Sequence, residues 1–183
     1  MDVLALGCRA ALIVVFGLAV AGKLRGRASW DAFVVSLAAL GVPSSWPAAP
    51  PAAAIVGLEA VAVLLLVAVP APGLALAAGL LAVFTAALGL ALRRGVRTPC
   101  RCFGASERPL GPAHLARNGI LLALAVGGVA GATLSPGLPG LQASISALLV
   151  GGTAGLLVAR WDDLLFLFTA GLARSEQPAP RRR

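Results

Sequence analysis

Charged side chains are scarce in this 183-residue chain. They make up 12% of its residues, whereas 59% are hydrophobic. A soluble domain carries about 25% charged residues, so this composition cannot cover a water-facing surface and excludes a soluble globular protein. Because a spanning helix needs roughly 20 mainly apolar residues, the length allows four or five spans. The composition therefore predicts one membrane domain.

Aromatic residues and cysteines are also few. Aromatic residues make up 5% of the chain, and nothing resembles an RNA-binding motif or an aromatic stacking platform, so the net charge of +8 does not indicate a nucleic-acid partner. The arginines lie beside apolar runs, which predicts a topology signal and attraction to anionic lipid. Three cysteines are too few for a disulfide-rich secreted scaffold. The high content of Ala, Gly, Pro and Arg is typical of a GC-rich genome, so we expect a multi-pass protein of a bacterial plasma membrane.

The long apolar runs predict an all-α, polytopic transmembrane bundle over residues 1–160. The expected spans are residues 3–22, 52–69, 74–92, 113–134 and 141–159. Residues 161–183 are expected to form an amphipathic segment and a disordered basic tail. The last two spans each contain one pair of glycines at the spacing that favours close helix packing, Gly127 with Gly131 and Gly151 with Gly155, although a chain with 22 glycines is expected to show a few such pairs by chance.

The first apolar run has features of a signal peptide, since Ala19-Val20-Ala21 imitates a cleavage site. Lys23, Arg25 and Arg27 follow at once, and such positive charge resists translocation. We therefore predict that this helix is retained, with Cys8 as a core residue.

The connection after the first span, residues 23–50, contains a short amphipathic pattern. Trp30, Phe33 and Leu37 recur at helical spacing. We expect a helix here that lies in the membrane interface, with Trp30 at headgroup level.

Basic residues orient the predicted spans. Residues 23–50, residues 93–113 and the C-terminal tail carry nearly all the Lys and Arg, whereas the predicted turns at 70–73 and 135–140 carry none. Five spans place the three basic segments on one side and both neutral turns on the other. The positive-inside rule then puts the basic side in the cytoplasm.

Glu59 stands within the second span, about 12 Å from its predicted start by helix rise. An unpaired carboxylate at that depth is unfavourable, so we expect it to be protonated or paired. Lys23, Arg9 and Arg117 are the candidate partners. The group either fixes helix packing or serves a proton or quinone site. A transporter is disfavoured, because no other acidic or basic side chain lies as deep and no span is broken in mid-membrane.

Two of the three cysteines, Cys100 and Cys102, lie one residue apart in the most basic loop. A disulfide between such close residues is strained and easily reduced, which suits exchange rather than stability. The two thiols could also bind a soft metal, Cu(I) or Zn²⁺, with His114 as third ligand, or be inert. The neighbouring Arg97 and Arg101 favour the reactive thiolate. Spacing alone leaves all three roles open.

Several residues combine into a family pattern. In chain order they are Gly22-Lys23-Leu24, Gly41-Val42-Pro43, Glu59, Cys100-Arg101-Cys102-Phe103-Gly104 and Arg117-Asn118. With them the sequence resembles the MauE family of methylamine utilisation proteins, within the wider DoxX-like group of small helical membrane proteins. The resemblance covers roughly residues 5–135, and the Cys-x-Cys-Phe-Gly motif is its most specific part. It implies a DoxX-like four-helix core, to which the fifth span is an extension.

The resemblance implies a membrane factor that assists maturation of an exported protein, the disulfide-rich small subunit of methylamine dehydrogenase, beside a thioredoxin-like partner. It implies no cofactor, and it leaves open whether the protein is itself an enzyme. On this view Cys100 and Cys102 form a redox pair. The residues with supporting roles would be Arg101, Phe103, Gly104, Glu59, Lys23, Arg117 and Asn118.

Two alternatives and one conflict accompany this hypothesis. The alternatives are a soft-metal-handling protein that uses Cys100, Cys102 and His114, and a non-catalytic membrane scaffold. The conflict concerns sidedness. Disulfides of an exported substrate form outside the cell, whereas the arginines place the cysteine pair inside.

Overall fold

The computed structural model describes residues 3–40, 47, 49–96, 110–134 and 140–161. All regular structure in these residues is helical. The helices are α1 (Val3–Leu24), α2 (Arg27–Ala39), α3 (Ala49–Ala68), α4 (Pro70–Arg93), α5 (Pro112–Leu134) and α6 (Leu141–Ala159). Every one except α2 is long and apolar enough to cross a membrane. The prediction of a multi-pass helical bundle with five candidate spans is confirmed, and residues 162–183 lie outside the described part.

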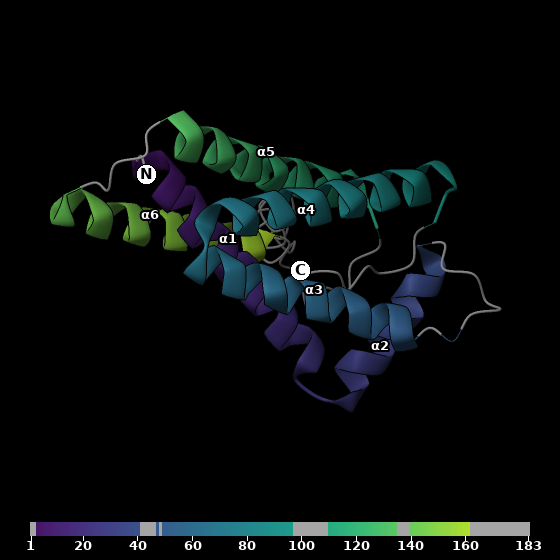
Figure 1. Ribbon diagram of the computed structural model, residues 1–183. Coiled ribbons are helices and arrows are strands. Elements are labelled where there is room, and N and C mark those ends of the chain that lie inside the picture. Colours follow the sequence, from purple (N-terminus) through teal and green to yellow (C-terminus); the bar gives the residue numbers. More distant parts are fainter. Residues whose placement is uncertain (1–2, 41–46, 48, 97–109, 135–139, 162–183) are drawn as a thin grey trace, which may run out of the picture.

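Helix α1 occupies the centre of the bundle (Figure 1) and contacts each of the other described helices. Its buried side chains Leu12, Val15 and Phe16 form one core cluster with residues of α3, α4 and α5, such as Leu66 and Leu121. Cleavage after this helix would therefore remove the middle of the fold, which supports the prediction that the first span is retained.

Close contacts define the directions of the helices. Ala5 faces Gly131 of α5, so α1 and α5 are antiparallel with Cys8 against Gly128. Gly7 lies against Gly151, and one turn later in both helices Ala11 lies against Gly155, so α1 and α6 are parallel. Leu74, near the start of α4, lies against the same Gly128 as Cys8, so α4 starts at the same side as α1. Consequently α1, α4 and α6 end at the same side of the bundle.

We call the side where α1, α4 and α6 end the basic end, and the opposite side the neutral end. The exposed arginines at the basic end are Arg25, Arg27, Arg93, Arg94 and Arg160. Arg9 is the one cation of the described residues that lies in the neutral half. This arrangement agrees with the predicted grouping of basic segments on one membrane side.

The predicted turn at residues 70–73 is wrong. Helix α4 begins at Pro70, and Val69 alone separates it from α3. Proline suits the first turn of a helix because its fixed φ is already helical and its missing N–H is not needed there. Gly73 permits the sharp reversal, since a Cβ at this position would overlap the backbone of Leu66.

Helix α2 packs one face against the bundle, and its predicted position in the membrane interface stays a prediction. Phe33 and Leu37 are buried and form a cluster with Ala52 and Val56 of α3. Trp30 is partly buried against the same cluster.

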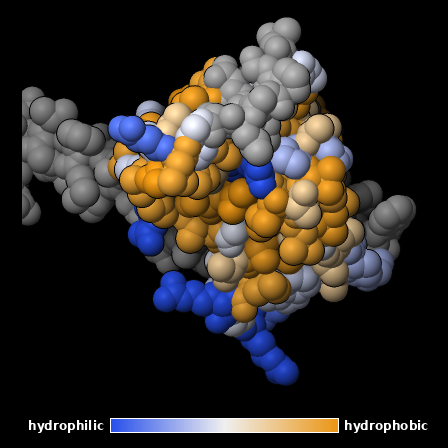
Figure 2. All heavy atoms as spheres, turned by 60° about the vertical axis from the view of Figure 1, so that its left-hand side comes forward, coloured by the Kyte–Doolittle hydropathy of each residue, from blue (hydrophilic) through white to orange (hydrophobic). Residues whose placement is uncertain are grey.

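The outer surface of the bundle is apolar. Figure 2 shows hydrophobic residues over most of the described surface on the face in view. Large exposed side chains include Leu64 on α3, Val83 on α4 and Leu149 on α6. Because a soluble monomer rarely exposes continuous apolar surface of this extent, the environment of these helices is a lipid bilayer.

Candidate functional site

Glu59 forms a buried ion pair with Lys23. The Lys23 Nζ lies 2.5 Å from Oε1 and 2.6 Å from Oε2 of the carboxylate. Their side chains are 1% and 0% exposed. By helix rise Glu59 lies about 15 Å from the start of α3, near the middle of that helix. Lys23 is thus the predicted candidate that binds this carboxylate.

Helix α2 covers the ion pair. The Lys23 Nζ stands 4.7 Å from the centroid of the Phe33 ring, within cation–π distance. Phe33 also meets Trp30 edge to face, with 6.3 Å between the ring centroids. The aromatic residues of α2 therefore help to exclude water from the charges.

The start of α5 carries three more buried polar residues: His114, Arg117 and Asn118 are 3%, 4% and 0% exposed. Helix α5 begins at Pro112, and the backbone N–H of His114 donates to the Gly111 carbonyl oxygen. In return the Gly111 N–H donates to His114 Nδ1 at 3.4 Å, so this side chain caps its own helix.

The helix register places these residues near the level of the ion pair. Cys8 lies against Gly128, and antiparallel helices rise equally per residue. Continuing that register along α1 brings Arg117 level with Ala19 and the start of α5 level with Lys23. We call Lys23, Glu59, His114, Arg117 and Asn118 the polar layer; it occupies the half of the bundle nearer the basic end.

Asn118 is unusual within the polar layer. Both its Oδ1 and its Nδ2 are buried, and neither has a hydrogen-bond partner among the described residues. Because buried polar side chains in folded proteins nearly always have partners, this amide is a candidate for a role other than packing.

The ends of the loop between α4 and α5 lie together. Leu110 is buried with Leu88 and Ala91, and Val96 packs against the same cluster. Leu115, which follows His114, joins it too. The base of the loop is therefore closed at the basic end, beside the start of α5. The predicted residues Cys100, Arg101, Cys102, Phe103 and Gly104 lie in this loop, outside the described residues.

A metal site is not formed by the described residues alone, since no three His, Cys, Asp or Glu side chains come together among them. The alternative site would require Cys100 and Cys102. His114 Nδ1 already accepts from the Gly111 N–H, so a metal would have to bind its Nε2.

Sequence analysis missed the role of Arg9. Its guanidinium donates to the carbonyl oxygens of Leu66 and Val67, with 2.6 Å between Nη2 and the Val67 oxygen. The Leu66 carbonyl would normally accept from the residue four positions later, but Pro70 has no N–H. A proline four residues after Leu66 leaves the Leu66 carbonyl without its backbone donor, and this was the sequence signal that a side chain would have to bind it.

The fold and the polar layer define a multi-pass helical membrane protein with ionisable groups buried in one half. The family model described as methylamine utilisation protein MauE matches residues 1–131, so the chain belongs to the MauE family. The match spans α1 to α4 and most of α5, whereas α6 lies beyond it. Neither a curated protein nor a solved structure matches the chain. Membership of this family suggests a membrane protein in methylamine utilisation.

Proposed function

We propose that this MauE-family protein is a thiol–disulfide redox factor of the bacterial plasma membrane that assists maturation of an exported protein. Cys100 and Cys102 form its redox pair and exchange with a thioredoxin-like partner. The observation that supports this best is the polar layer beside the closed base of their loop. Ionisable residues within a membrane are uncommon and mark functional sites by default.

The exchange balances without a further reactant. A thiolate of the partner attacks the disulfide between Cys100 and Cys102, and a mixed disulfide forms while one cysteine leaves as a thiolate. The second partner thiolate then attacks the mixed disulfide. The pair ends as two thiols, and the partner dithiol ends as a disulfide. The reverse direction reoxidises the pair at the expense of the partner disulfide.

The polar layer supports this chemistry through protons. Reduction of the pair takes up two protons, and its oxidation releases them. The carboxylate of Glu59 and the ammonium of Lys23, held 2.5 Å apart, are groups that can share and pass a proton. In this proposal Arg117 and Asn118 position the loop from the start of α5, and Arg101, Phe103 and Gly104 shape it.

The test uses the three cysteines directly. A Cys8→Ser variant carries Cys100 and Cys102 alone, and a membrane-impermeant maleimide reagent applied to intact cells reports on which side they lie. Labelling before and after reductant reports their redox state. We expect a reducible disulfide in part of the population. In the reverse direction the second cysteine of the pair resolves the mixed disulfide, so one of the single variants Cys100→Ser and Cys102→Ser should trap the mixed disulfide that its remaining thiol forms with the partner disulfide.

Three outcomes separate the alternatives. A pair that never forms a disulfide or a mixed disulfide rules out the redox function. Stoichiometric copper or zinc that is lost in both Cys100→Ser and His114→Ala would establish the metal-handling alternative. Undiminished maturation of the exported protein with Cys100→Ser and Cys102→Ser combined would leave the scaffold alternative.

A further inference from the structure

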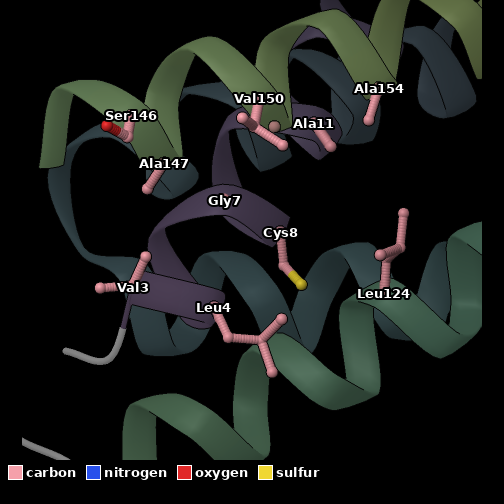
Figure 3. A pocket seen from close by; sticks show the side chains of 11 residues that line it. Val3, Leu4, Gly7, Cys8, Ala11, Leu124, Ser146, Ala147, Val150 and Ala154 are labelled. Carbon is pink, nitrogen blue, oxygen red and sulfur yellow. The ribbon is translucent and has the colours of Figure 1, made fainter. Parts of the chain in front are cut away.

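An apolar groove lies between α1, α5 and α6, in the neutral half of the bundle (Figure 3). Its volume is about 350 Å³, within the roughly 300–1,000 Å³ range of ligand pockets. Leu4 and Cys8 line it from α1, Leu124 from α5, and Val150 and Ala154 from α6. No residue of the polar layer lines the groove, so the proposed redox chemistry does not use it.

The packing of α6 explains why the groove exists. A Cβ at Gly151 would overlap the backbone of Gly7, and one at Gly155 would come 2.6 Å from the Ala11 carbonyl oxygen. The absence of side chains at both glycines lets α6 settle closely on α1. Contacts of α6 with the described helices are mainly with α1, so the space between α6 and α5 is left to the groove.

The groove opens sideways to the bilayer. Val150 and Leu4 at its rim are 70% and 60% exposed, whereas Ala147 at its floor is buried. Its lining is almost entirely hydrocarbon, and none of the described residues that line it is charged. It is therefore continuous with the lipid-facing surface and favours an uncharged hydrocarbon chain.

The groove also meets a more polar depression. Ser146 lines both, and the second depression lies around Gly140 and Gln142 at the start of α6. This start lies at the neutral end, where the candidate span α6 begins. An apolar groove that continues into a polar depression at the end of a span matches the shape of an amphiphile: a chain within the membrane and an ester region at its surface.

We propose that one phospholipid from the leaflet at the neutral end inserts an acyl chain into this groove and links α6 to α5. The glycerol ester region lies beside Ser146 and Gln142. Because the described residues of the lining carry no charge, the site selects the chain and not the headgroup. The acyl chain fills the space between α6 and α5, which few contacts bridge among the described residues. Helix α6 lies beyond the family match.

The test is photo-crosslinking in nanodiscs. The probe is phosphatidylcholine with a diazirine in one acyl chain, and adducts are mapped by peptide mass spectrometry. We expect adducts concentrated on the groove residues of α1 and α6. Ala154→Phe should lower their yield roughly tenfold, because the ring occupies the space of the chain. Thr153→Phe, one residue along α6 and exposed to lipid, is the matched control and should leave the yield unchanged.

Further arms decide the source of the chain and guard against misfolding. Phosphatidylglycerol carrying the same diazirine chain should label the groove equally. Leu124→Phe blocks the groove from α5 and should reproduce the effect if Ala154→Phe does not fold. Adducts spread evenly over exposed residues such as Leu64 and Val83, or a yield that neither blocking variant changes, would overturn the proposal. Palmitate carrying the same diazirine, supplied at equal chain concentration, should label the groove residues less than phosphatidylcholine does, because it lacks the glycerol ester region beside Ser146 and Gln142; stronger labelling by the fatty acid would identify it as the occupant and also overturn the proposal.

Discussion

Arg9 and Lys23 lie near opposite ends of α1, and both carry a positive charge into the bundle. Arg9 binds backbone carbonyls at the end of α3, whereas Lys23 binds the carboxylate of Glu59 in the middle of the same helix. Arg9 is half-buried, and Lys23 is buried. Arg9 therefore supplies hydrogen-bond donors to backbone carbonyls, whereas Lys23 neutralises the charge of a carboxylate.

This difference separates a structural cation from a candidate functional one. The Leu66 carbonyl that Arg9 binds lacks its usual backbone donor because Pro70 has no N–H. Nothing in the backbone requires Glu59, so a leucine there would pack without the Lys23 partner. A pair that the fold could replace with apolar residues, but retains, is a candidate for chemistry.

The largest expected effect comes from breaking the buried pair on one side. Lys23→Met leaves the carboxylate of Glu59 buried without its partner, and we expect a loss of about 3–5 kcal/mol in the free energy of unfolding. Thermal or denaturant unfolding of the purified protein in detergent measures this loss. A loss below about 1 kcal/mol would mean that the pair is not buried as the structure shows.

Replacing both partners sharpens the comparison. Lys23→Met with Glu59→Leu should return the stability to within about 1 kcal/mol of the parent or above it, because no charge remains buried. If the pair handles protons, this stable double variant will exchange thiols slowly at Cys100 and Cys102. Exchange at the parental rate would assign the pair to packing alone.

A smaller effect is expected at Arg9. Arg9→Met leaves the carbonyls of Leu66 and Val67 without their donor, at a cost of about 1–3 kcal/mol. Arg9→Lys should recover part of this loss, because a single ammonium cannot reproduce the two-pronged contact of a guanidinium. The same unfolding measurement applies. The control is Arg25→Met, which removes an exposed cation from the connection between α1 and α2. It should change the free energy of unfolding by less than about 0.5 kcal/mol.

Part of the fold and of the candidate site could be predicted from the sequence. The five spans follow from apolar length alone, so they were predicted with ends that differ by a few residues. Gly151 and Gly155 were recognised by spacing, and the structure places them against α1. The partner of Glu59 was narrowed to three cations but not chosen, because that choice depends on how α1 crosses α3.

Other features lay beyond local patterns. Residues 70–73 have the composition of a turn. Proline occurs both just after the end of a helix and in the first turn of the next one, so the local sequence did not distinguish a turn from a helix start. The periodicity of α2 predicted its helix but not the burial of Phe33 over Lys23, which requires the position of α3. Cys100 and Cys102 were identified by spacing and family pattern, and their redox role stays a prediction.

An effect somewhat smaller than that of Arg9→Met is expected from removing the cover over the pair. Phe33→Leu keeps an apolar side chain in the cluster with Val56 but removes the aromatic face 4.7 Å from the Lys23 Nζ. Loss of a desolvated cation–π contact should cost about 1–2 kcal/mol, and it should vanish in the Lys23→Met, Glu59→Leu background, where no cation remains. Unfolding measured for the four proteins of this cycle isolates the coupling between ring and ammonium. An equal cost in both backgrounds would show that Phe33 stabilises α2 by packing alone, so that the ion pair does not depend on its aromatic cover.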